Sequence, residues 1–233
     1  MSNELLLIGS VVLIYGLVLI AYKVFHKTGL YIMSGIMTIL ANIEALMIVE
    51  GFGMEQTLGN VMFAATFLIT DILSENESEK DAARAVWMGG FSSVTMLLLT
   101  QYWMLYTLAP SDWAGEHIRA IFSTTPRMLF ASLSVYVICQ RFDVWLYHYW
   151  WRLTTRKSGD NKRFLWIRNN GSTMVSQLIN TVLFTLFAFS GWYDMPTLIS
   201  IMVSSYVIFI FTSLLDTPAV YFARWMKQKG WVD

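Results

Sequence analysis

Polar side chains at helical spacing run through one of the apolar stretches of this chain. The stripe consists of Thr173, Gln177, Asn180 and Phe184. Their separations of four, three and four residues place all of them on one face of an α-helix. Inside an apolar helix such a stripe must face protein or water, and hydroxyl and amide groups both donate and accept hydrogen bonds. The stripe therefore predicts the lining of a site or pathway for a polar solute.

Further ionisable and amide side chains stand within apolar runs, where lipid would exclude them. Asp71 and Glu75 are four residues apart and share a helix face, and the same holds for Gln140 and Asp143, which are three apart. A charged group inside a bilayer costs about 2.5–3.5 kcal/mol, so a function or a structural contact must offset that cost. The candidate binding residues are Asn42, Asp71, Glu75, Gln140, Asp143, Asn170, Thr173, Gln177, Asn180, Phe184 and Asp216.

A structural role is the alternative for each of these residues. Glu75 leads into an acidic loop and could be a solvated helix end. Asp216 precedes Pro218, where it could repair the hydrogen-bond ladder that proline interrupts. Arg141 could form an ion pair with a carboxylate of another helix. The sequence leaves these alternatives open.

Catalytic signatures are absent from the sequence. It contains no H-E-x-x-H pair and no G-x-S-x-G elbow, and no cysteine and histidine residues stand at metal-binding spacing. The three histidines, His26, His117 and His148, are dispersed at the ends of apolar runs. We therefore expect neither an enzyme nor a metal or other cofactor.

Seven apolar runs must position the candidate residues. The chain has 233 residues, of which 56% are hydrophobic and 14% are charged, whereas about a quarter are charged in soluble domains. A crossing of the bilayer takes about 20 apolar residues, and only helices or closed barrels satisfy the backbone there. The sequence predicts an all-α integral membrane protein, a bundle of seven transmembrane helices at about residues 4–25, 30–50, 57–74, 85–109, 127–150, 171–192 and 196–223.

Lysine and arginine residues favour one side of such a bundle. Seven crossings leave only Arg119 and Arg127 on the far side, which predicts an N-terminus outside and a cytoplasmic C-terminus. The near side carries Lys23, Lys27, Lys80, Arg84, Arg152, Arg156, Lys157, Lys162, Arg163, Arg168, Arg224, Lys227 and Lys229. The net charge is zero, which argues against nucleic acid as a partner.

Several segments resemble, in order, those of the queuosine precursor transporters. They are residues 41–43 (ANI), 71–75 (DILSE), 125–127 (TPR), 140–143 (QRFD), 168–173 (RNNGST), Gln177 and residues 215–218 (LDTP). The resemblance runs from about residue 30 to the C-terminus. It implies a six-helix core, residues 30–233, similar to the substrate-binding components of energy-coupling-factor vitamin transporters. Residues 1–29 then form an additional N-terminal transmembrane helix.

The resemblance implies import of 7-cyano-7-deazaguanine, 7-aminomethyl-7-deazaguanine or queuine across the bacterial inner membrane. A carboxylate can accept two adjacent donors of a 7-deazaguanine ring, an amide can donate to its carbonyl, and an aromatic ring can cover its face. A homodimer is plausible for so small a transporter. The alternatives are a binding subunit that needs an energising ATPase module, docked through small residues such as Gly89 and Gly90, and a membrane scaffold without transport activity.

Two positions depart from the family pattern. Many members carry an aspartate where this chain has Asn180 and a lysine where it has Phe209. Loss of both partners leaves no unpaired charge, so the resemblance implies that neutral residues have replaced an ion pair here. The replacement could also alter the preference among the three precursors.

Overall fold

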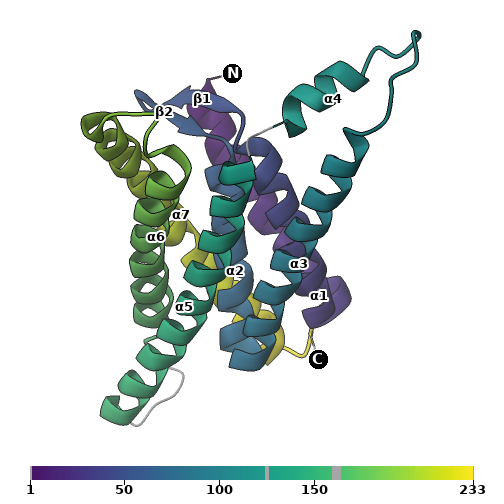
Figure 1. Cartoon of the computed structure of the whole chain (residues 1–233). Helices are drawn as coiled ribbons and strands as arrows, with labels where there is room; N and C mark the ends of the chain where they lie inside the picture. Colours follow the sequence, from purple (N-terminus) through teal and green to yellow (C-terminus); the bar gives the residue numbers. More distant parts are fainter. Residues whose placement is uncertain (1, 124–125, 159–163, 233) are drawn as a thin grey trace.

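The computed structural model describes residues 2–123, 126–158 and 164–232, apart from the side chains of residues 55, 126–129 and 157–158. Figure 1 shows a helical bundle with the N-terminus and the C-terminus at opposite ends. We call these the N-terminal end and the C-terminal end of the bundle. The elements are α1 (Asn3–Glu44), β1 (Ile48–Gly51), β2 (Met54–Thr57), α2 (Gly59–Asn76), α3 (Glu79–Trp103), α4 (Gly115–Phe122), α5 (Pro126–Ser158), α6 (Leu165–Phe189) and α7 (Met195–Gln228). The predicted all-α class is confirmed.

Helix α1 consists of two halves that fold back on each other. His26 interrupts it with φ 54° and ψ −147°, a conformation that non-glycine residues rarely adopt. A Cβ atom at Gly29 would overlap the carbonyl oxygen of Ala21, so only glycine fits this reversal. The side-chain Nδ2 of Asn3 donates to the carbonyl of Glu50 at 2.7 Å. The start of α1 and the segment that follows α1 therefore both lie at the N-terminal end of the bundle. The first two predicted helices are therefore one hairpin of helices.

The second predicted run, residues 30–50, ends earlier than expected. Its helix stops at Glu44, and β1 pairs with β2 in an antiparallel hairpin with Ile48 opposite Thr57. Phe52 and Gly53 have positive φ angles of 55° and 72° at the turn of this hairpin. The β-branched residues around the turn explain the change from helix to strand, because such side chains favour the pleated surface of a sheet.

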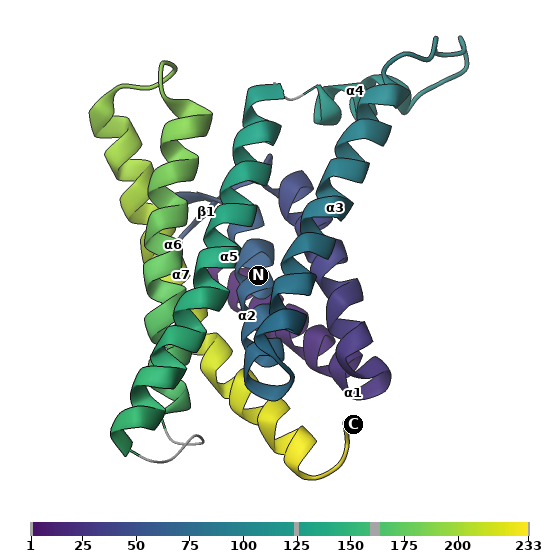
Figure 2. The same cartoon turned by 60° about the horizontal axis from the view of Figure 1, so that its bottom comes forward.

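Four of the described helices are long and apolar enough to cross a membrane, namely α1, α3, α6 and α7. Helix α2 lies among the other helices in both views (Figures 1 and 2). Its residues from Ala64 to Ser74 are all buried. Because other helices cover this part of α2, its polar side chains are shielded from lipid. Counting both halves of α1, we see seven long helical segments within the described residues. That all seven cross the membrane stays a prediction.

The outer faces of the helices expose large apolar side chains. Leu13 of α1, Phe91 of α3 and Phe211 of α7 have 63%, 73% and 64% of their surfaces exposed. Soluble monomers rarely expose large contiguous apolar patches. These faces therefore suit contact with lipid tails.

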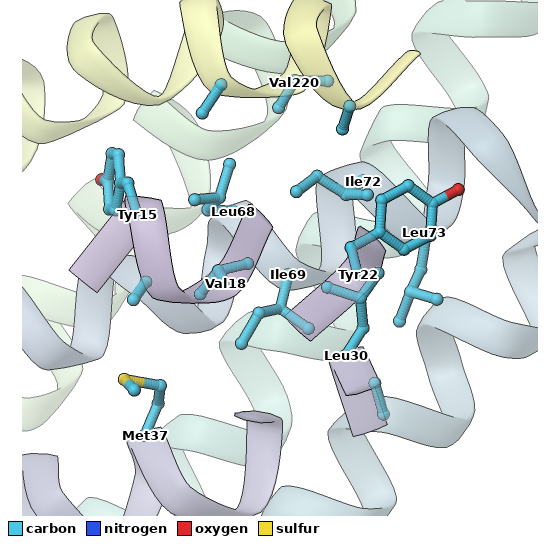
Figure 3. Packing of buried hydrophobic residues seen from close by; sticks show 14 of the residues in the cluster. Tyr15, Val18, Tyr22, Leu30, Met37, Leu68, Ile69, Ile72, Leu73 and Val220 are labelled. Atoms are coloured by element: carbon cyan, nitrogen blue, oxygen red, sulfur yellow. The ribbon is translucent and has the colours of Figure 1, made fainter. Parts of the chain in front are cut away.

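The apolar core joins α1, α2, α3 and α7. Figure 3 shows Tyr15 and Val18 of α1 next to Leu68 of α2, with Val220 of α7 across from them. The first half of α1 thus shares one core with the rest of the bundle. The proposed division into residues 1–29 and 30–233 stays a prediction.

Candidate functional site

A cavity of about 90 Å³ lies near the N-terminal end of the bundle. Its wall comes from α1, β2, α2, α3, α5, α6 and α7, so no single segment of the sequence defines it. The lining residues are Thr38, Ala41, Asn42, Ala45, Thr57, Gly59, Asn60, Phe63, Ser93, Ser132, Leu133, Tyr136, Asn180, Thr181, Phe184, Thr185, Phe189, Ile201, Ser205 and Phe209. Three predicted site residues are among them: Asn42, Asn180 and Phe184.

Asn42 is fixed at the cavity by contacts with two other helices. The hydroxyl of Ser132 on α5 donates to Asn42 Oδ1 at 2.8 Å. Asn42 Nδ2 donates to the carbonyl of Thr38 at 2.8 Å and reaches Ser93 Oγ on α3 at 3.5 Å. These bonds hold the amide in one orientation at the junction of α1, α3 and α5.

Three polar atoms at the cavity have unused hydrogen-bonding capacity. Asn60 Nδ2, the Tyr136 hydroxyl and Thr181 Oγ1 are buried, and none of them has a hydrogen-bond partner among the described residues. Unpaired buried polar groups are rare because each one loses its hydrogen bonds to water. A polar solute in the cavity would satisfy them. The sequence did offer a signal for Thr181, which continues the stripe one turn beyond Gln177, but none for Asn60.

Aromatic rings form the apolar part of the wall. Phe63 of α2 contacts Tyr136 of α5 edge to face, with ring centroids 6.1 Å apart, and lies 6.2 Å from Phe209 of α7. Phe184 and Phe189 of α6 are in edge contact at 5.8 Å. The cavity thus offers aromatic rings together with amides and hydroxyls, a combination suited to a planar polar ligand.

The predicted stripe continues from the cavity along α6 into the interior. Asn180 Nδ2 donates to Gln177 Oε1 at 3.4 Å. One turn further on, the Thr173 hydroxyl donates to Asp71 Oδ2 on α2 at 3.0 Å. These side chains are buried, so α6 carries a polar connection from the cavity toward the C-terminal end.

Most of the other predicted residues form a buried layer below the cavity together with Asn169, which the sequence did not single out. We call this the polar layer: Asp71, Gln140, Asp143, Asn169, Asn170, Thr173 and Asp216. Gln140 accepts from the Thr70 hydroxyl at 3.2 Å and donates to Thr66 Oγ1. Asn169 Nδ2 donates to Asp216 Oδ1 at 2.7 Å. Asn170 Nδ2 donates to Thr217 Oγ1 at 2.7 Å. The layer joins α2, α5, α6 and α7.

Glu75 lies apart from the cavity in an ion cluster near the C-terminal end. Arg168 of α6 binds it through two bonds, Nε to Oε2 at 2.8 Å and Nη2 to Oε1 at 2.6 Å. Arg224 of α7 approaches at 3.2 Å, and the Tyr147 hydroxyl of α5 donates at 2.7 Å. The Arg168 guanidinium also lies 4.4 Å from the centre of the Trp151 ring. The structure thus places Glu75 in a contact among four helices rather than in the acidic loop.

The structure therefore divides the eleven predicted residues among three places. Asn42, Asn180 and Phe184 line the cavity, Gln177 and the polar layer lie below it, and Glu75 belongs to the ion cluster. The two departures from the family pattern, Asn180 and Phe209, line the same cavity from α6 and α7. Which of these residues touch a substrate stays a prediction.

Comparison with known proteins gives two matches. Residues 57–223 match the family described as "Putative vitamin uptake transporter". The chain is 36% identical to the "Probable queuosine precursor transporter" of Bacillus subtilis (strain 168) over 226 residues, which cover 97% of this chain and 96% of that protein. No solved structure matches.

Proposed function

The chain belongs to the family described as "Putative vitamin uptake transporter", and on this premise we propose that it imports a queuosine precursor across the bacterial inner membrane. The proposed substrates are 7-cyano-7-deazaguanine, 7-aminomethyl-7-deazaguanine and queuine. Membership makes the chain a multi-pass membrane transporter of a small molecule and confirms that it is not an enzyme. The observation that supports this substrate class is the cavity with polar and aromatic walls.

The polar groups of the cavity suit the edge of a 7-deazaguanine ring. Such a ring presents adjacent N–H donors and a carbonyl acceptor. Asn180 offers an amide oxygen to the donors, and the unused Nδ2 of Asn60 can donate to the carbonyl. Among the described lining residues there is no carboxylate, so in this proposal amides take the role that we expected of a carboxylate. Phe184 and Phe63 cover the faces of the ring.

The two ends of the bundle suit opposite sides of the membrane. Many of the described basic residues lie at the C-terminal end of the bundle, where α1 reverses and α7 ends, as with Lys27 and Lys227. Cytoplasmic segments carry an excess of such residues. This orientation puts the N-terminus and the cavity outside. The ion cluster at Glu75 then closes the cytoplasmic side. The cavity would thus receive its ligand from outside, as import requires.

Uptake in cells tests the proposal. A strain that cannot make queuosine precursors is grown with 7-cyano-7-deazaguanine, and queuosine in its tRNA is measured with and without this protein. We expect queuosine only when the protein is expressed. Unchanged tRNA in cells that contain the protein in their membrane would contradict the proposal.

Binding can be located with Thr181→Val, which removes one unused hydroxyl and keeps the shape of the side chain. We expect binding of the preferred deazapurine to weaken about tenfold, the value of one hydrogen bond, with the thermal stability of the free protein unchanged. The measure is stabilisation of the purified protein by a panel of deazapurines, because a ligand that binds the native state raises its stability. Thr154→Val on α5, where the hydroxyl bonds the carbonyl of Trp150 at 2.8 Å, is the matched control. Equal affinity in wild type and Thr181→Val would exclude Thr181 from the site.

The second candidate, a subunit that needs an ATPase module, finds less support. Gly89 could have belonged to a docking surface, but a Cβ there would overlap the Tyr136 hydroxyl, so this glycine packs α3 against α5. Transport by the purified chain alone in liposomes without ATP would separate the two candidates. A homodimer stays a prediction.

A further inference from the structure

Three carboxyl groups meet in the polar layer, and the described residues place no opposing charge beside them. Asp71 of α2, Asp143 of α5 and Asp216 of α7 are all at most 1% exposed. Each interacts electrostatically with another member of the trio. Burial and mutual repulsion both favour the protonated form of a carboxyl group, so three carboxyls that are buried together are not all expected to stay ionised. At least one member of the trio is therefore expected to carry a proton.

Within the part of the chain that the structure describes, the charged and titratable groups around the trio include no cation. They are Tyr15 of α1, Glu75 of α2, and Cys139 and Tyr147 of α5. From α6 the groups that face the trio are the neutral side chains of Asn169, Ser172, Thr173 and Ser176. Arg168 of the ion cluster is paired with Glu75.

Hydrogen-bond donors are also too few. Thr173 supplies one bond to Asp71 and Asn169 supplies one to Asp216. Asp71 Oδ1 and both oxygens of Asp143 accept no bond of good geometry from a donor among the described residues, and Asn169 Oδ1 and Ser176 Oγ, both fully buried, are unpaired as well. The hydroxyls of Ser172 and Ser176 face Asp143. Several oxygens therefore converge where a positive charge is missing.

We propose that Asp71, Asp143 and Asp216 form a proton-binding site, and that one proton, shared by Asp71 and Asp143, moves inward with each substrate molecule. The proton is taken up from the outside and released to the cytoplasm, and no bond of the substrate changes. The described residues include no group of three histidine, cysteine, aspartate or glutamate side chains that could hold a metal ion, which favours a proton over a metal cation. The coupling rests on the proposed function, because it requires that a substrate moves.

The site is connected to the cavity through α6. Thr173, which bonds Asp71, shares its helix face with Gln177 and Asn180, and Asn180 lines the cavity. A ligand that shifts Asn180 would also move the donor to Asp71. Proton binding and substrate binding thus act on one helix.

Infrared spectroscopy tests the proton site without any substrate. In the purified wild-type protein at neutral pH we expect a carbonyl stretching band of a protonated carboxylic acid that shifts in D₂O. Asp143→Asn and Asp71→Asn should each remove that band, and Glu116→Gln, which removes an exposed carboxyl from α4, should leave it unchanged. A wild-type spectrum without such a band, or a band that both variants retain, would overturn the proposal. Should neither variant fold, disappearance of the wild-type band only at strongly alkaline pH supports the site, and its absence at neutral pH overturns it.

Replacing choline chloride by sodium chloride at equal ionic strength separates the two possible cations. An unchanged band supports a proton, whereas loss of the band in sodium alone shows a sodium site and overturns the proton.

Proteoliposomes test the coupling. With labelled 7-cyano-7-deazaguanine and an alkaline interior, one proton per neutral substrate supports about tenfold accumulation for each pH unit of gradient. A protonophore should abolish the accumulation. Asp143→Asn should keep exchange of labelled for unlabelled substrate and lose accumulation. Gradient-independent uptake by the wild type would refute the coupling and leave the proposed function intact. No uptake of any deazapurine would refute the proposed function and with it the coupling, while the infrared result still decides the proton site.

Discussion

Amide side chains suit the cavity because each carries both a donor and an acceptor. Asn42 accepts a hydrogen bond from Ser132 and donates one to the carbonyl of Thr38, so it shapes the wall where three helices meet. Asn60 and Thr181 have the opposite property, since each leaves a buried polar atom unpaired. At the scale of single residues, Asn42 stabilises the wall of the cavity, whereas Asn60 and Thr181 keep polar atoms that a ligand could bind.

Asn180 and Phe209 allow a direct test of the prediction that neutral residues replace an ion pair at these two positions. Asn180→Asp places a carboxylate in the cavity and Phe209→Lys places an amine there, and each alone should lower thermal stability because its charge is unpaired. Together they should recover stability, with a coupling of about 0.5–3 kcal/mol. Thermal unfolding of the four proteins measures this coupling. Effects that simply add would show that the two positions do not face each other.

At the scale of elements, α6 connects the three places where predicted site residues lie. From the N-terminal end it presents Asn180 to the cavity, Thr173 to the polar layer and Arg168 to the ion cluster. A helix repeats its faces every three to four residues, so the stripe joins the cavity to the polar layer, and Arg168 extends from another face of the same helix. Movement of α6 would therefore change all three places together.

The ion cluster connects α2, α5, α6 and α7 and stabilises their packing. Glu75→Gln should destabilise the protein by roughly 3–5 kcal/mol, because it leaves Arg168 buried without its carboxylate. Glu79→Gln is the control, since the ion pair of Glu79 with Arg152 is long, at 3.9 Å, and exposed, and such pairs contribute about 0–1 kcal/mol. Thermal unfolding compares the two. Equally small losses of stability in both variants would mean that the cluster does not stabilise the packing of the helices.

The start of α7 responds to pH through its cap. Asp194 Oδ1 accepts the Thr197 N–H at 3.2 Å. Hydrogen bonds from the Thr197 side chain and from this N–H lower the pKa of Asp194 below its ordinary value. A lowered pKa stabilises the folded state above the unfolded pKa, and the stabilisation is lost as pH falls through the folded pKa. Asp194→Asn keeps the cap, because asparagine also caps well, and should remove this part of the acid sensitivity. Unfolding temperatures measured from neutral to acidic pH check it, and identical profiles would contradict it.

At the scale of the whole molecule, the outer faces of the helices are apolar, whereas the interior holds polar groups beside the apolar core. Phe91 and Phe211 face outward, whereas Asp71 and Asp143 are fully buried. In a bilayer this arrangement is stable because lipid tails accept the apolar faces and neighbouring helices shield the polar ones. A polar solute would thus meet hydrogen-bonding groups only within the bundle.

The orientation of the molecule can be tested with single cysteines. Cys139 is the only cysteine and is buried, so Cys139→Ala provides a background. Ser2→Cys should react with a membrane-impermeant maleimide applied to spheroplasts, and Lys229→Cys only after the membrane is opened. The reverse pattern would show that the N-terminus is cytoplasmic, and labelling of both from outside would exclude an odd number of crossings.

The sequence by itself determined the helical class, the stripe on α6 and the excess of basic residues at one end, because periodicity and charge are local properties. It did not give the reversal of α1 at His26, the hairpin after Glu44 or the short helix α4, which depend on turns and contacts rather than on apolar length.

Only the tertiary structure decided which polar residues share a cavity. Asn60, Ser132 and Phe209 reach it from three helices far apart in the sequence, whereas Glu75, four residues from Asp71, lies in the ion cluster. Helical spacing says which side chains share a face, but the neighbour that each face meets depends on how the helices pack. For that reason the sequence supplied the chemical groups, and the packing of the helices placed them in the cavity, the polar layer or the ion cluster.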